Sequence, residues 1–219
     1  MIGFDWHGSL CELVPHHFLD PLNQVLKALG QPSLEGLGQE ISVFDTIANA
    51  AKHDRRNTQL ALHLFKELYK ENFISPYNIL PGAKETLEFY KSHRIQTFLI
   101  SNHMEDLLLH DLKRTKLDSY FMHVIGARDI NDLKPKTTMF NRFFMSLGAK
   151  HDSTIPTYYC GDSVSDIIAA GNAGCQTILV QKRPIYRPLC KPHTWVENIS
   201  ALPKLVNPTL QSTPITFVR

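Results

Sequence analysis

Short apolar runs recur along the chain and predict the strands of a buried sheet. They are rich in β-branched and aromatic residues, are bounded by polar or glycine positions, and occupy residues 2–4, 97–100, 122–125, 157–160 and 177–180. Runs of this length and composition are typical of strands that are covered on both faces. The longer segments that separate the later runs have helical periodicity, at residues 83–92, 105–114, 137–147 and 165–172. This alternation predicts an α/β fold, a doubly wound parallel sheet of Rossmann-like type.

One long region interrupts this alternation, because residues 14–77 contain no convincing strand. Three segments within it have helical periodicity, at residues 15–29, 40–52 and 57–72. A stretch of this length is too long for an ordinary loop in a compact domain. We therefore expect a small helical domain at 14–77, inserted into an α/β core of residues 1–13 and 78–206. Residues 207–219 are polar and contain proline, and are expected to form a loosely held tail.

Composition narrows the classes of partner. The 219 residues carry a formal net charge of +2, and no run of Lys or Arg is longer than two. A nucleic-acid or membrane-surface partner is therefore not expected. No apolar stretch approaches the ~20 residues that span a bilayer, and the N-terminus lacks the pattern of a signal peptide. The four cysteines show no metal-binding spacing. We expect a cytoplasmic protein, a monomer or a homodimer.

Polar side chains gather where predicted strands end, at the edge where open α/β sheets bind ligands. They are Asp5, Ser101, Asn102, Lys134, Asp162 and Asp166. Two carboxylates four residues apart near a helix start suit Mg²⁺, which prefers oxygen ligands. A hydroxyl and an amide can donate to a phosphoryl oxygen, and a lysine can place a charge beside it. Each feature alone also fits helix capping, or a solvated surface lysine.

Taken in chain order, these residues resemble the four motifs of the haloacid dehalogenase superfamily. The resemblance covers the chain from about residue 1 to residue 206. Leu-Pro-Gly at 80–82 and Gly-Asn-Ala-Gly at 171–174 are similar to the phosphoglycolate-phosphatase-like branch, which carries a helical cap. The resemblance implies a phosphoric monoester hydrolase that acts on a small phosphorylated metabolite, with the inserted helical domain as its cap.

The resemblance also implies a role for each motif residue. Asp5 is the nucleophile that forms an aspartyl-phosphate intermediate. The phosphoryl group is held by Ser101, Asn102 and Lys134, and Lys134 also holds the nucleophile. Mg²⁺ is bound by Asp5, the backbone carbonyl of His7, Asp162 and Asp166.

His7 departs from the family pattern, because family phosphatases have a second Asp two residues after the nucleophile. That Asp serves as general acid and base, and an imidazole with an ordinary pKa near 6.5 suits the same task. A second interpretation is a phosphonatase-like enzyme, since Asp5-Trp6 resembles that start and Lys52 could form the Schiff base. A third is a catalytically impaired relative that keeps the phosphate and metal site. Dehalogenases also lack the second Asp but use no Mg²⁺, so the Asp162/Asp166 pair argues against them.

Three further histidines lie near these motifs in the sequence. His16 and His17 follow the first motif, and His103 follows Ser101-Asn102. We expect each of them at a surface or helix-capping position rather than in the site.

Overall fold

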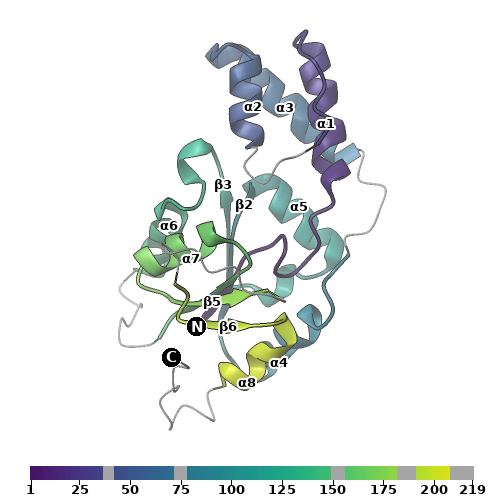
Figure 1. The fold of residues 1–219 in the computed structure, drawn as a ribbon. Helices are drawn as coiled ribbons and strands as arrows, with labels where there is room; N and C mark the ends of the chain where they lie inside the picture. Colours follow the sequence, from purple (N-terminus) through teal and green to yellow (C-terminus); the bar gives the residue numbers. More distant parts are fainter. Residues whose placement is uncertain (37–41, 72–77, 149–155, 182–190, 208–219) are drawn as a thin grey trace. The chain divides into compact units, whose positions relative to one another are not determined.

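The computed structural model describes residues 1–36, 42–71, 78–148, 156–181 and 191–207 (Figure 1). The chain divides into two compact units. The first comprises Met1–Glu12 and Tyr77–Arg219, and the second comprises Leu13–Pro76. Of the expected tail at 207–219, all but Asn207 lies outside the described residues.

The first unit is built on a six-stranded parallel sheet with the order β3-β2-β1-β4-β5-β6. Its strands are β1 (Ile2–Phe4), β2 (Thr97–Met104), β3 (His123–Ala127), β4 (Tyr158–Gly161), β5 (Gln176–Val180) and β6 (Thr194–Val196). The sequence pattern predicted the first five, with ends that differ by up to four residues. It did not predict β6, which has three residues and an exposed Trp195 at its centre.

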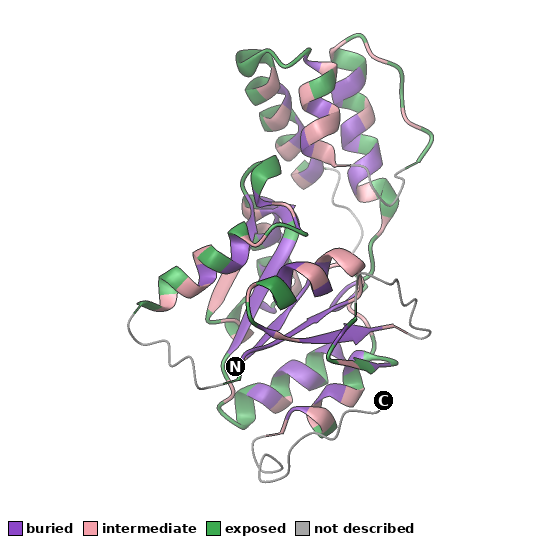
Figure 2. Cartoon of the chain, turned by 60° about the vertical axis from the view of Figure 1, so that its left-hand side comes forward, coloured by how far each residue is buried: buried purple, intermediate pink, exposed green. Residues whose placement is uncertain are grey.

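Helices cover both faces of this sheet. The main ones are α4 (Ala83–Ser92), α5 (Glu105–Thr115), α6 (Thr138–Leu147) and α7 (Val164–Asn172). In Figure 1, α6 and α7 lie to the left of the sheet and α5 to its right. The strands are buried along most of their length, whereas these helices expose one side (Figure 2). The expected doubly wound α/β fold is confirmed.

The described part of this unit also contains shorter elements, three of which are 3-10 helices. These elements are η1 (Asp118–Tyr120), η2 (Ile130–Asp132), η4 (Ile199–Ala201) and α8 (Leu202–Leu205). The 3-10 helix η2 ends two residues before Lys134 and therefore helps to place that residue.

The sheet reverses its winding at β1, which pairs with β2 on one side and β4 on the other. Phe4 lies opposite Leu99 of β2 and Cys160 of β4. Residues that follow these partners therefore emerge side by side at the carboxyl edge. In open α/β sheets this reversal opens a crevice where ligands bind.

The second unit contains three helices in its described part, α1 (Pro15–Ala28), α2 (Val43–Ala50) and α3 (Arg55–Glu71). Pro15 stands at the first turn of α1, where its missing N–H has no helical partner to lose. Aromatic side chains join α1 to α3, with the Phe18 and Tyr69 ring centroids 5.3 Å apart. None of the described helices is both long enough and apolar enough to cross a membrane.

Candidate active site

Asp5 follows β1 directly and lies at the reversal point of the sheet. Its side chain is largely buried, and its backbone N–H donates to the carbonyl of Cys160 at 2.9 Å. The chain then turns at Gly8, whose φ of +79° favours glycine. A Cβ at Gly8 would lie 2.2 Å from Asp162 Oδ2. Glycine at this position therefore allows the loop after Asp5 to approach Asp162 closely.

Three carboxylates converge at this point. Asp162 follows β4, and Asp166 lies in the first turn of α7. One oxygen from each of Asp5, Asp162 and Asp166 lies within 4.8 Å of the other two. Hard cations such as Mg²⁺ are bound by oxygen ligands in small clusters of this kind.

The electrostatics of the cluster also favour a cation. Burial raises the pKa of Asp5 to about 6, with Lys134 opposing the shift and Asp166 adding to it. Burial, Asp166 and Asp5 together raise the pKa of Asp162 to about 8. The protein alone therefore does not fully compensate the negative charge of these carboxylates. A divalent cation would do so, and the donor set fits Mg²⁺.

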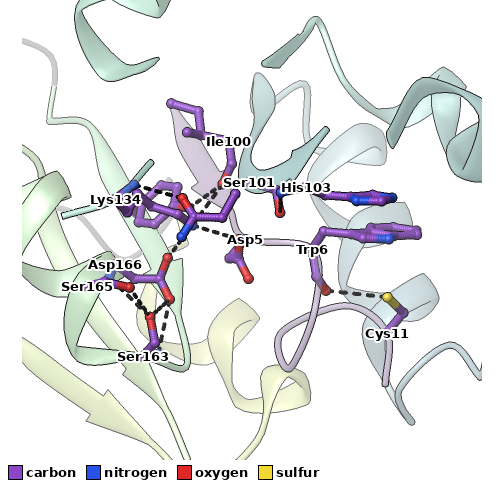
Figure 3. Close-up of polar contacts among 12 residues, drawn as sticks. Asp5, Trp6, Cys11, Ile100, Ser101, His103, Lys134, Ser163, Ser165 and Asp166 are labelled. Atoms are coloured by element: carbon purple, nitrogen blue, oxygen red, sulfur yellow. Dashed lines mark hydrogen bonds and ion pairs between the residues drawn. The ribbon is translucent and has the colours of Figure 1, made fainter. Parts of the chain in front are cut away.

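Lys134 lies between two of these carboxylates, and its side chain is only 2% exposed. Its ammonium donates to Asp5 Oδ1 at 2.7 Å and also to Asp166 Oδ1 (Figure 3). Burial acts to lower the pKa of Lys134, but Asp166 and Asp5 outweigh it and the pKa is raised. The lysine is therefore a permanent positive charge beside Asp5.

Ser101 and Asn102 belong to β2, which continues to Met104 rather than ending at residue 100 as expected. Ser101 is buried, and its Oγ accepts from the backbone N–H of His103 at 3.3 Å. Asn102 Oδ1 accepts from the backbone N–H of Lys134 at 2.7 Å. Asn102 thus links the end of β2 to the loop that carries the lysine.

A network of ion pairs holds that loop from its other side. Arg142 of α6 contacts Asp132 Oδ2 at 2.8 Å and also pairs with Glu105 of α5. Asp132 in turn accepts from the backbone N–H of Arg128 at 2.9 Å. These residues give no signal in the sequence, because their spacing along the chain resembles that of ordinary surface charges.

His7 lies two residues after Asp5 and is half-buried. Its ring centroid is 5.2 Å from that of His103, and the two rings meet edge to face. His103 Nε2 is 2.9 Å from Asp111 Oδ2, and both side chains are buried. The expectation of a surface or capping role for His103 is therefore wrong.

Two buried polar residues near the site were missed by the sequence analysis. Asp111 lies on the buried face of α5, between Leu108 and Leu112, and a charge on an apolar helix face was the available signal. Tyr159 lies within the apolar run of β4, where a tyrosine gives no signal. The Tyr159 hydroxyl contacts Lys134 Nζ at 3.1 Å.

Comparison with known sequences identifies a family and several named relatives. Residues 21–180 match the haloacid dehalogenase-like hydrolase family. Phosphoglycolate phosphatase 1 of Pseudomonas aeruginosa is 27% identical over 185 residues, which cover 80% of this chain and 66% of that enzyme. A phosphoglycolate phosphatase of Pseudomonas fluorescens is 26% identical over 228 aligned positions, covering 97% of this chain and 82% of that enzyme.

Solved structures show the same fold. A predicted phosphoglycolate phosphatase from Haemophilus somnus has a TM-score of 0.73 at 23% identity, over 94% of this chain and 96% of that one. A Bacillus subtilis protein described as a putative HAD-hydrolase bound to magnesium has a TM-score of 0.62 at 14% identity. That match covers 94% of this chain and 97% of the other. At these identities the likeness establishes the arrangement of the elements.

Proposed function

This chain belongs to the haloacid dehalogenase-like hydrolase family, and on that premise we propose that it is a Mg²⁺-dependent phosphatase of small phosphomonoesters. The observation that carries the proposal is the meeting of Asp5, Lys134 and the Asp162/Asp166 pair at one end of the sheet. A nucleophile, a fixed cation and a set of metal ligands are the parts that phosphoryl transfer to a carboxylate requires.

Asp5 is the nucleophile in this proposal. Lys134 binds its Oδ1, which leaves Oδ2 to attack phosphorus. The new bond joins Asp5 to phosphorus, while the bond from phosphorus to the leaving oxygen breaks. Water then attacks the aspartyl-phosphate, releases phosphate and restores the carboxylate. Ser101 and Asn102, in the second half of the neighbouring strand β2, hold the phosphoryl oxygens.

His7 carries the protons. In the first step the imidazolium donates a proton to the leaving oxygen, and in the second the imidazole accepts one from the attacking water. Its position two residues after the nucleophile supports this assignment, since family phosphatases place their acid and base there.

Asp5, Asp162, Asp166 and the backbone carbonyl of His7 would hold Mg²⁺. When bound, the cation offsets the repulsion between carboxylate and phosphate, which is about 4 kcal/mol for unit charges 4 Å apart at an effective dielectric near 20. The three clustered carboxylates support this assignment, as does the magnesium described for the Bacillus subtilis relative.

The substrate is a small phosphorylated metabolite, and the helical unit at 14–77 corresponds to the helical cap of the phosphoglycolate-phosphatase-like branch. Phosphoglycolate is the first ester to test, because relatives that cover most of this chain are named for it. One observation favours a second candidate function. His7 stands where a catalytic Asp is usual, which would suit a phosphonatase-like enzyme or a relative that binds phosphate and metal without turnover.

The deciding experiment is release of phosphate from a panel of phosphomonoesters, with and without Mg²⁺. Asp5→Asn, which keeps the shape of the site, serves as the blank. We expect Mg²⁺-dependent turnover that the blank lacks, and the preferred ester then identifies the substrate class. A folded protein that binds Mg²⁺ but gives no turnover above the blank would favour the second candidate.

A further inference from the structure

A buried tyrosine, Tyr159, lies next to Lys134. Tyr159 has no solvent-exposed surface, and its hydroxyl is 3.1 Å from Lys134 Nζ. We propose that Tyr159 is a positioning residue that fixes the Lys134 ammonium on Asp5. Lys134 then serves the nucleophile as a fixed charge. This inference rests on the proposed phosphatase function and specifies how its lysine works.

The hydrogen bonds of the ammonium support this assignment. An ammonium has three N–H donors, and four acceptors surround this one. They are Asp5 Oδ1, Asp166 Oδ1, the Tyr159 hydroxyl and the carbonyl of Ile100. The protein therefore supplies at least one acceptor for every N–H of Lys134.

The tyrosine also decides which three acceptors are used. Its own O–H donates to the Ile100 carbonyl at 2.5 Å, whereas Lys134 Nζ lies 3.3 Å from the same carbonyl. Burial, followed by the charges of Asp166 and Asp5, raises the pKa of Tyr159 well above its ordinary value, so the phenol keeps this proton. A lone pair of the hydroxyl is thereby directed at the ammonium. The three N–H groups then go to Asp5, Asp166 and Tyr159.

Packing keeps the hydroxyl in place. The Tyr159 ring meets the edge of Phe140 at 4.8 Å and lies 6.3 Å from Phe98. A ring packed on several sides in the centre of a sheet has few alternative rotamers. Lysine, in contrast, is a flexible chain with high rotamer entropy. A rigid third acceptor therefore limits the ammonium to one position, in which it binds Asp5 Oδ1 and leaves Oδ2 free to react.

The test removes the oxygen alone, by Tyr159→Phe. We expect kcat on the preferred ester to fall ~10-fold, while KM and the inhibition constant of inorganic phosphate stay within ~2-fold. Tyr158→Phe is the matched control, because Tyr158 is the buried neighbour on the same strand and projects to the other face. Its kcat should match wild type. An unchanged kcat in Tyr159→Phe, or a rise in KM with kcat unchanged, would overturn the proposal.

A second measurement works without turnover and so separates this inference from the phosphatase proposal. In wild type, the Lys134 ammonium should give a ¹H–¹⁵N signal protected from exchange with water, assigned by its loss in Lys134→Met. Tyr159→Phe should abolish that protection, and Tyr158→Phe should keep it. If wild type shows no protected lysine signal, the positioning role is wrong whether or not the protein is an enzyme. If the signal behaves as expected but no ester is hydrolysed, only the phosphatase proposal fails.

Discussion

Single residues account for the main departure from the family pattern. An imidazole differs from a carboxylic acid in shape and charge, so its surroundings have to differ as well. His7 meets the ring of His103, which is held in turn by the buried Asp111. In this chain, His7 therefore contacts a second imidazole, that of His103, whose orientation is fixed by its buried hydrogen bond to Asp111.

The proposed role of His7 predicts a dependence on the leaving group. An alkyl phosphate needs a proton on its leaving oxygen, whereas p-nitrophenyl phosphate leaves readily as an anion. His7→Ala should therefore lower kcat/KM, which reports the phosphoryl-transfer step, by about 100-fold on the alkyl ester but by less than ~10-fold on the nitrophenyl ester. His7→Asp should retain turnover of both. Steady-state kinetics of the three proteins tests this, and equal losses of kcat/KM on both esters would exclude a role of His7 in protonating the leaving oxygen.

At the scale of elements, the start of α7 combines a helix cap with a proposed metal ligand. Ser163 Oγ accepts from the backbone N–H of Asp166 at 3.2 Å, and Asp166 Oδ2 accepts from the backbone N–H of Ser163 at 3.0 Å. The capping box thus fixes the same carboxylate that we assign to Mg²⁺. Capping and metal binding are therefore compatible interpretations of Asp166.

This arrangement predicts that the Ser163 helix cap affects the affinity of the proposed site for Mg²⁺. Ser163→Ala should cost about 1 kcal/mol of stability and raise the Mg²⁺ concentration for half-maximal activity several-fold. Ser42→Ala is the control, because Ser42 caps α2 in the other unit through Asp45 at 3.3 Å. Ser42→Ala should lower the free energy of unfolding by a similar amount without altering the Mg²⁺ concentration for half-maximal activity. A titration of activity with Mg²⁺ and urea unfolding measure the two effects, and equal Mg²⁺ requirements in both variants would contradict the coupling.

The loop that carries Lys134 depends on the α6 ion pairs. The Arg142 side chain is 21% exposed and the Arg128 side chain 64%, although both pair with Glu105. Water screens an exposed pair strongly, so Arg128→Met should cost less than about 0.5 kcal/mol. Arg142→Met leaves the largely buried Asp132 without its ion-pair partner and should cost about 1–2 kcal/mol, with a lower kcat. Urea unfolding of the two variants provides the comparison, and equal losses would show that burial does not distinguish these pairs.

The elements also show how far sequence patterns reach. Apolar runs predicted β1 to β5, because a strand covered on both faces has to be apolar along its length. The same pattern concealed Tyr159, whose hydroxyl has a partner only after β4 and the loop of Lys134 come together. The motif spacing predicted that Asp162 and Asp166 meet, because one follows a strand directly and the other lies in the first turn of the next helix. The motif spacing contained no information on Asp111. The partner of Asp111, His103, comes from another element, and the signal for Asp111 was a charge on an apolar helix face.

At the scale of the whole molecule, the sheet topology concentrates negative charge in a chain whose net charge is +2. The reversal at β1 brings Asp5 beside the end of β4, and so close to Asp162 after that strand and Asp166 at the start of α7. Lys134 is held by Asp5 and Asp166. The stability of the metal-free protein should therefore depend on the protonation of this cluster.

The sign of that dependence follows from the raised pKa values of Asp5 and Asp162, about 6 and about 8. An unfolded Asp titrates near 3.9, so between pH ~4 and ~8 the folded state binds more protons than the unfolded state. Their contribution to stability is fully present below pH ~4 and is lost as the pH rises through 6 and 8. In EDTA, the melting temperature should therefore fall by about 5–10 °C between pH 5 and pH 8.5.

Mg²⁺ should reverse this trend, because it binds the folded state through ionised carboxylates and stabilises that state by mass action. The rise in melting temperature on adding Mg²⁺ should be larger at pH 8.5 than at pH 5. Asp162→Asn removes the group with the higher pKa, so it should flatten the pH profile and weaken the Mg²⁺ effect. Calorimetry of the wild type and of Asp162→Asn at the two pH values, with and without Mg²⁺, tests both expectations. A melting temperature in EDTA that rises with pH, or a Mg²⁺ effect independent of pH, would show that these carboxylates are already ionised and compensated without the cation.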